Sequence, residues 1–243
     1  MVTQVITCYH CNSENIVKNG KAPNGKQKYL CHDCSRQSRE NPGSNAHPPE
    51  RRQEILSAYQ ERSSLRALAR TPSGSRATLS RAGSKKAARL PPLSRTLSPA
   101  PPSAEDLVLE LDELWSFVGK KANKRWVWIA LARHTRQVVA YVIGQRGERT
   151  CQRLWEMIPQ SYKGGSCYSD FWEAYRAVIP QERHEAVSKE SGELAHVERW
   201  NNTLRQRLAR FVRKTLSFSK SDEMHEVCLK LFLHRYNEDV ILR

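Results

Sequence analysis

Two pairs of cysteines near the start of the chain limit what its first part can fold into. Cys8 and Cys11 form one Cys-x-x-Cys pair, and Cys31 and Cys34 form a second pair after 19 intervening residues. Two residues between ligands let both sulfurs of a pair reach one tetrahedral Zn²⁺, and two such pairs complete a Cys₄ site. With a turn at Asn24-Gly25, the spacing predicts a zinc ribbon. The zinc should be structural, because a closed Cys₄ site has no open position for catalysis.

The positive charge of the chain is concentrated around this module. The net charge is +15, and the first 100 residues hold 17 of the 40 Lys and Arg residues but only 6 of the 25 acids. A charged stretch is often only a solvated face, but here the excess coincides with a zinc module, so we expect phosphate contacts with nucleic acid. The candidate DNA-binding lysines are Lys18, Lys21, Lys26 and Lys28.

Membrane insertion and export are not expected. The longest apolar run, Trp126–Ala132, has seven residues, whereas a spanning helix needs about 20. The first 20 residues lack the apolar core of a signal peptide. We therefore expect a cytosolic protein with reduced thiols and no membrane partner.

Composition divides the chain into blocks. Residues 1–45 contain the paired cysteines and end in the polar stretch 41–45, and residues 48–70 have the apolar spacing of two short helices. Residues 71–104 contain six prolines and no acid, which predicts a linker or a poorly folded segment. All six tryptophans and all five phenylalanines follow residue 114, so the main core must be C-terminal.

The region after residue 105 predicts an α/β domain. Apolar runs indicate strands, and amphipathic stretches between and after them indicate helices. We expect strands over 107–112 (running on toward 118), 126–132, 138–143, 166–169 and 184–188, and helices over 148–158, 171–178, 192–214 and 221–236. Three strands followed by alternating helix and strand are typical of an α/β layered fold.

Three acids occur where this secondary structure would bring them together. Asp112 lies in the first strand, Asp170 ends the short fourth strand, and Glu198 lies on the long helix. Converging carboxylates suit Mg²⁺, and two such ions serve phosphodiester chemistry. Glu110 and Glu113 compete with Asp112; strand alternation puts Glu110 on its face and Glu113 on the other, and spacing alone does not decide.

The helical position of Glu198 favours a functional role. At about 100° per residue, Glu198 and Arg205 fall at the border of the buried arc rather than on the cationic face of the predicted helix. A carboxylate beside the core is typical of an active site. The simpler alternative is that Glu198 is only an ion-pair partner of Arg205.

Several long motifs resemble the transposase of the bacterial insertion sequence one family. The motifs are Asp112–Phe117, Tyr168–Tyr175, His196–Asn202, Arg213–Lys220 and Tyr59–Arg66. Together with the zinc module, the resemblance covers nearly the whole chain.

The resemblance implies an Asp-Asp-Glu transposase made by fusion of two reading frames, with a ribonuclease-H-like α/β catalytic domain. It maps Asp112, Asp170 and Glu198 onto the catalytic triad and places Arg205 where such enzymes contact terminal DNA. It also implies a zinc finger and a helix-turn-helix that recognise terminal inverted repeats. The expected domains are a zinc ribbon (1–45), a helix-turn-helix-like segment degenerate after 71 (48–90), a linker (91–104) and the catalytic domain (105–243).

The stretch 72–84 departs from the family pattern. A bulky apolar pair is replaced by Ala82-Gly83. Glycine costs about 1 kcal/mol in a helix interior, and alanine buries little surface. We therefore expect the third helix to pack poorly and specific binding to the terminal repeats to be weakened.

Together these features predict a transposase that binds terminal repeats and target DNA, cleaves and transfers strands with Mg²⁺ or Mn²⁺, and works as a homo-oligomer on the bacterial nucleoid. The main alternative is a zinc-dependent DNA-binding regulator without catalysis, which needs only the first hundred residues. A nuclease acting on RNA hybrids would share the carboxylates but would not need terminal-repeat recognition.

Overall fold

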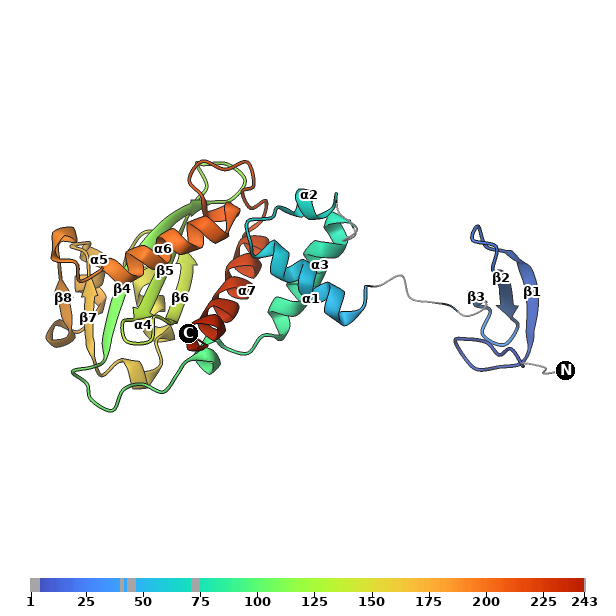
Figure 1. Cartoon of the computed structure of the whole chain (residues 1–243), viewed down its shortest axis with the longest axis horizontal. Coiled ribbons are helices and arrows are strands. Elements are labelled where there is room, and N and C mark those ends of the chain that lie inside the picture. Colours follow the sequence, from blue (N-terminus) through green and yellow to red (C-terminus); the bar gives the residue numbers. More distant parts are fainter. Residues whose placement is uncertain (1–4, 40–41, 43–46, 71–74, 243) are drawn as a thin grey trace. The chain divides into compact units, whose positions relative to one another are not determined.

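The computed structural model describes residues 5–39, 42, 47–70 and 75–242. Most of the polar stretch at 41–45 and the start of the departing segment at 72–74 lie outside these residues. The chain forms two compact units, Met1–Pro48 and Pro49–Arg243 (Figure 1). Each unit is described by itself.

The first unit is a three-stranded antiparallel sheet in the order β1-β2-β3. Its strands are β1 (Ile16–Lys21), β2 (Gln27–Cys31) and β3 (Gln37–Arg39). The first hairpin turns at Gly25, whose φ of +80° favours glycine and whose N–H donates to the carbonyl of Ala22 at 2.9 Å. The sheet buries few apolar side chains, among them Tyr29. It therefore needs another source of stability.

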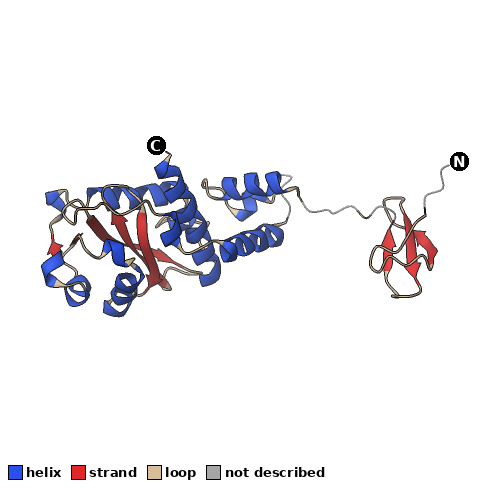
Figure 2. Ribbon diagram, turned by 90° about the horizontal axis from the view of Figure 1, so that it is seen from below, coloured by secondary structure: helices blue, strands red, loops and turns tan. Residues whose placement is uncertain are grey.

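A five-stranded mixed sheet in the order β6-β5-β4-β7-β8 forms the centre of the second unit (Figure 2). The first three strands pair antiparallel, and β7 and β8 join them in parallel. The strands are β4 (Val108–Phe117), β5 (Lys124–Ala132), β6 (Val138–Gly144), β7 (Ser166–Ser169) and β8 (His184–Ala186). The predicted strands are confirmed, and the α/β sheet fits a ribonuclease-H-like fold.

Helices cover both faces of this sheet. Along β5, Val127, Ile129 and Leu131 face one core, while Trp128 and Ala130 face the other, as strand alternation requires. The first core includes side chains of α6 and α7, and the second includes side chains of α4 and α5. The helices are α4 (Glu148–Met157), α5 (Glu173–Val178), α6 (Ala195–Arg207) and α7 (Asp222–Ile241).

The long helix predicted over 192–214 is shorter in the structure. Helix α6 ends at Arg207, Leu208 is extended, and a short 3-10 turn (η5) follows at Ala209–Phe211. Leu208 and Phe211 are both buried, so the chain turns inward to bury them and leaves the helix. Their spacing continued the helical pattern, which is why the sequence prediction ran too far.

The segment predicted as a linker or poorly folded is ordered over much of its length. The helices before the sheet are α1 (Pro49–Tyr59), α2 (Leu65–Leu68), α3 (Arg76–Arg89) and the 3-10 helix η1 (Leu93–Thr96). Helix α3 lies beside α7 (Figure 1). Leu93 of η1 joins the core shared with α6 and α7.

The prediction that the third helix packs poorly is wrong. Gly83 and Ala87 of α3 are buried, and a Cβ on Gly83 would lie 3.7 Å from Val227 and 3.9 Å from Leu231 of α7. Small side chains let the two helix backbones approach closely. Gly83, which is expected from the sequence to weaken the packing, is therefore part of the contact with α7.

None of the helices in the described part of the chain combines the length and hydropathy that a membrane crossing requires.

Candidate active site and zinc centre

The four cysteines form one cluster. Their Sγ atoms all lie within 4.8 Å of one another, with Cys8 and Cys34 at 3.6 Å and Cys11 and Cys31 at 3.6 Å. The backbone N–H of His10 approaches the sulfur of Cys8 at 3.4 Å and is the main cause that lowers the pKa of this thiol to about 6. Thiolates in this arrangement fit a structural Zn²⁺, as the spacing predicts.

The lysines predicted to contact DNA lie on this ribbon. Lys18 and Lys21 are exposed on β1, Lys26 is exposed at the start of the second strand, and Lys28 is half-buried on β2. Their role in DNA binding stays a prediction.

Asp112 lies in the middle of β4, the central strand of the large sheet, paired opposite Ile129. One carboxylate oxygen accepts the backbone N–H of Glu113 at 2.8 Å, and the other accepts the side-chain amide of Asn201 at 2.6 Å. Burial is the main cause that raises the pKa of Asp112 to about 7. The negative charges of Glu113, Asp170 and Glu198 raise it further.

Asp170 follows β7 directly. Because Glu110 pairs with Tyr168 in the parallel register of β4 and β7, Asp112 and Asp170 are each two residues beyond the same pair. One oxygen of Asp170 accepts the backbone N–H of Trp172 at 3.0 Å, which fixes the carboxylate at the strand end.

Glu198 lies in the first turn of α6, and the start of this helix is anchored on β4. Buried Glu110 accepts the backbone N–H groups of His196 and Val197, both at 3.0 Å. It also binds the His196 ring at 2.6 Å and Arg133 at 2.8 Å. A carboxylate at a helix N-terminus is favourable because it satisfies unpaired N–H groups. Glu110 thereby holds the turn that carries Glu198 against the strand of Asp112.

The two alternatives to Asp112 have other partners. Both oxygens of Glu110 are engaged at the start of α6. Glu113 points to the opposite face, where it accepts the Tyr175 hydroxyl at 2.7 Å and pairs with Arg146 at 2.7 Å. Burial is the main cause that raises the pKa of Glu113. Asp112, unlike these two acids, forms no ion pair with a described residue; that it acts with Asp170 and Glu198 stays a prediction.

A buried amide completes this group of carboxylates. Asn201, one turn after Glu198 on α6, is 8% exposed, and its side-chain oxygen has no hydrogen-bond partner among the described residues. Amide and carboxylate oxygens are ligands for hard divalent cations. The chemistry of these side chains suits a hard divalent cation. Among the described residues, the four cysteines are the one group of acids, histidines and cysteines that brings three or more ligand atoms within 4.8 Å of one another.

The sequence prediction missed Asn201. Its only sequence signal is the spacing of three residues from Glu198, which places the two side chains on neighbouring positions of a helix face. Its bond to Asp112 joins residues 89 positions apart, and no local pattern reveals such a contact.

Arg205 lies one further turn along α6. Its guanidinium donates to the carbonyl of Phe211 at 2.9 Å and approaches that of Trp115 at 3.5 Å. Burial is the main cause that lowers its pKa, and the charge of Arg213 acts the same way, while the charge of Asp112 opposes both. Arg205 therefore lies near the carboxylates and also closes the end of the helix.

Comparisons with known proteins cover both units. The model of the IS1 transposase matches residues 106–237, and the model of the InsA N-terminal domain, a zinc ribbon, matches residues 1–35. Insertion element iso-IS1n protein InsB of Shigella dysenteriae is 38% identical over 132 residues, which are 54% of this chain and 96% of that protein. Insertion element IS1 4 protein InsB of Escherichia coli (strain K12) is 36% identical over 146 residues, 60% of this chain and 85% of that protein.

Proposed function

Because the chain belongs to the IS1 transposase family, we propose that it binds the terminal repeats of its element and catalyses strand cleavage and strand transfer with Mg²⁺ or Mn²⁺. The observation that carries the proposal is the register of β4 and β7, in which Asp112 and Asp170 are each two residues beyond one paired position. The start of α6, which carries Glu198, is bonded to the same strand β4 through Glu110. Three acids, from β4, from the end of β7 and from α6, are thus expected to meet at one site.

Asp112, Asp170 and Glu198 would hold the catalytic ions. Such ions, when bound, lower the pKa of an attacking oxygen and stabilise the leaving oxygen of an in-line phosphoryl transfer. Asn201 holds the Asp112 carboxylate through its amide N–H, and Glu110 fixes the start of the helix that carries Glu198. Water would attack the phosphodiester at the element end and displace the 3′-oxygen, which leaves as a 3′-hydroxyl. That hydroxyl would then attack a phosphodiester of target DNA and displace the target's 3′-oxygen, which leaves as a hydroxyl.

Basic side chains in each of the two units would bind DNA. Arg205 would contact terminal DNA, and Lys18, Lys21, Lys26 and Lys28 would contact phosphates through the zinc ribbon. Arg81, Lys85 and Arg89 follow one another every four residues on the exposed side of α3. That row gives α3 a second surface for the terminal repeats, opposite the face packed on α7.

The enzyme would act as a homo-oligomer on the nucleoid in the bacterial cytoplasm. Transposition requires that two element ends be held together, so at least two copies take part.

A cleavage assay on a duplex that carries the element's own terminus tests this function. Asp170→Asn keeps the shape of the side chain but removes a charged oxygen ligand, so it should abolish Mg²⁺-dependent strand cleavage and leave DNA binding intact. Glu182→Gln, on the 3-10 helix before β8, is the matched control and should cleave normally. Cleavage by Asp170→Asn at the wild-type rate would remove Asp170 from the mechanism. Absence of cleavage in the wild type, with DNA binding intact, would favour a regulator without catalysis.

A further inference from the structure

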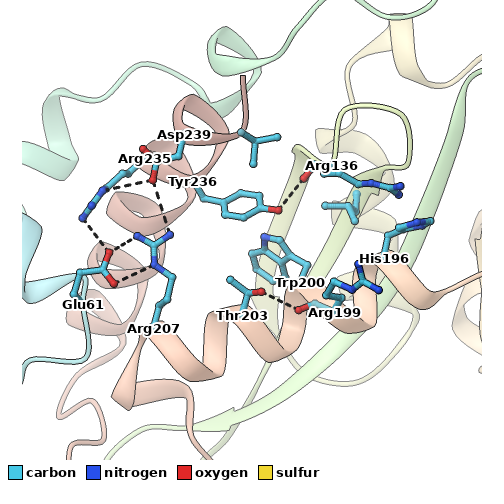
Figure 3. A pocket seen from close by; sticks show the side chains of 12 residues that line it. Glu61, Arg136, His196, Arg199, Trp200, Thr203, Arg207, Arg235, Tyr236 and Asp239 are labelled. Carbon is cyan, nitrogen blue, oxygen red and sulfur yellow. Dashed lines mark hydrogen bonds and ion pairs between the residues drawn. The ribbon is translucent and has the colours of Figure 1, made fainter. Parts of the chain in front are cut away.

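A cavity of about 530 Å³ opens between α6, the C-terminal end of α7 and the turn between β5 and β6 (Figure 3). We call it the α6–α7 groove. Its lining includes His196 and the arginines Arg136, Arg199, Arg207 and Arg235, and its acids are Glu61 and Asp239. The lining is therefore rich in arginine, and arginine forms paired hydrogen bonds with phosphate.

The groove and the carboxylates use different faces of one helix. His196, Arg199 and Thr203 line the groove, at spacings of three and four residues. The same spacings recur two residues further along α6, at Glu198, Asn201 and Arg205. At about 100° per residue the two sets lie on roughly opposite faces of α6. The groove is thus separate from the proposed catalytic centre.

One end of the groove is neutralised by the protein itself. Arg207 and Arg235 both pair with Glu61, which lies between α1 and α2, and both also approach Asp239. Figure 3 shows these four side chains gathered at one end. Glu61 and Asp239 hold these two arginines in place and balance their charge, so no bound anion is required at this end.

The other end of the groove is lined by two arginines and a histidine, and the acids of the lining are not at this end. Figure 3 shows Arg136, His196 and Arg199 close together there. Arg136 and Arg199 are exposed, and neither guanidinium has a hydrogen bond or an ion pair among the described residues. The Nδ1 atom of His196 is bonded to buried Glu110, which fixes the ring. The Nε2 atom of His196 has no partner in the described part of the chain.

The wall of the groove adds an unpaired donor. Trp200 lines the groove and is 2% exposed, and its indole N–H has no partner among the described residues. Tyr236 donates its hydroxyl to the carbonyl of Arg136 at 3.1 Å and so fixes the turn that carries this arginine. The open end therefore presents positive charge on a framework that is already held in position.

We propose that the α6–α7 groove binds the phosphodiester backbone of DNA through Arg136 and Arg199. The bound segment is distinct from the strand at the carboxylates, because the two sites lie on opposite faces of α6. The identity of the polyanion as DNA rests on the proposed function. The contact is independent of base sequence, since arginine–phosphate contacts position DNA without reading it.

The test measures binding of the full-length, zinc-loaded protein to a labelled duplex without element ends. The buffer contains no Mg²⁺ or Mn²⁺, so catalysis plays no part, and affinity is followed by fluorescence anisotropy over a series of salt concentrations. The double variant Arg136→Ala/Arg199→Ala should bind about tenfold more weakly, with a salt slope shallower by about 2. Arg136→Lys/Arg199→Lys should recover part of the slope, because the charge remains.

The matched control is Arg149→Ala/Arg153→Ala, which removes two exposed arginines from α4. It should leave the salt slope nearly unchanged. An unchanged slope in the groove variant, an equal loss in the control, or a changed oligomeric state with unchanged DNA affinity would each overturn the proposal. Thermal melting of both variants checks that they are folded. If the groove variant bound DNA as the wild type does while Asp170→Asn lost cleavage, the proposed DNA contact in the groove would be wrong and the proposed function would still hold.

Discussion

The two units of the chain are stabilised in different ways. The first buries few apolar side chains and gathers four cysteines at one point, whereas the second buries two apolar cores, one on each face of its sheet. A small sheet without a sufficient core depends on a metal, and a larger one does not. The comparison shows that the same chain uses its metal ligands for folding in one unit and, by our proposal, for chemistry in the other.

The largest effect is expected from removal of one zinc ligand. Cys31→Ser should lose zinc and unfold the first unit, because binding of structural zinc contributes on the order of 10 kcal/mol to folding. The second unit should stay folded. Zinc content and two-dimensional NMR spectra measure both outcomes. Cys167→Ser, in the core of the second unit, is the control and should keep its zinc. A folded first unit without zinc would contradict the comparison.

A smaller effect on the free energy of unfolding is expected when the pH is lowered, and it should come from a histidine of the second unit. His225 is fully buried, stacks on Phe211 and bonds Ser219, and burial is the main cause that lowers its pKa to about 4. The unfolded state takes up a proton near pH 6.5, so the contribution of His225 to the free energy of unfolding should fall as the pH drops from about 6.5 to 4. One proton over this window amounts to roughly 3 kcal/mol.

Denaturant unfolding of wild type and His225→Gln at several pH values measures this effect. The variant should show a shallower decline below pH 6.5, whatever its absolute stability. The same decline in both proteins would show that His225 is not the group that titrates.

Asn201→Ala should weaken metal binding by the second unit about 10- to 100-fold, the usual cost of losing a residue that orients a metal ligand. The substitution removes the amide that holds Asp112 and the unpaired oxygen beside it. Electron paramagnetic resonance titration with Mn²⁺ measures the affinity without catalysis. Exposed Asn202 is the matched control, and Asn202→Ala should bind Mn²⁺ as the wild type does. Equal effects of both substitutions would remove Asn201 from the site.

The smallest effect concerns the packing of α3 on α7. Gly83→Ala should stabilise the second unit by about 0.5–1 kcal/mol, because alanine favours a helix and its Cβ would make only ordinary contacts with Val227 and Leu231. Gly83→Leu should instead destabilise it by about 1–3 kcal/mol through overpacking. Unfolding curves of the two variants give both values. If Gly83→Leu stabilised the second unit instead, the result would support the prediction that Gly83 makes α3 pack poorly.

The same contrast explains how much of the fold the sequence could predict. The strands β5 and β6 contain long apolar runs, so their positions can be predicted from the sequence to within a few residues, and the cysteine spacing predicts the zinc cluster. The order of α3 was not predicted, because Gly83 and Ala87 are small residues whose burial depends on α7, more than a hundred residues away. The end of α6 was also missed, since Leu208 and Phe211 continue the helical spacing after the helix has ended.

The candidate site shows the same division. Asp112, Asp170 and Glu198 could be selected because each lies on a predicted strand or helix at a position from which the three could meet; that they share a site stays a prediction. Asn201, and the engagement of Glu110 by the start of α6, depend on contacts between distant segments. Local patterns carry no information about such contacts.

Anomalous diffraction from crystals soaked in Mn²⁺ tests most directly whether the three carboxylates share a metal site. The account predicts a peak about 2 Å from oxygens of Asp112, Asp170 and Glu198 in the wild type, and loss of this peak in Asp112→Asn while the zinc peak at the four cysteines persists. A fully occupied Mn²⁺ peak elsewhere, with none among the three carboxylates, would contradict it.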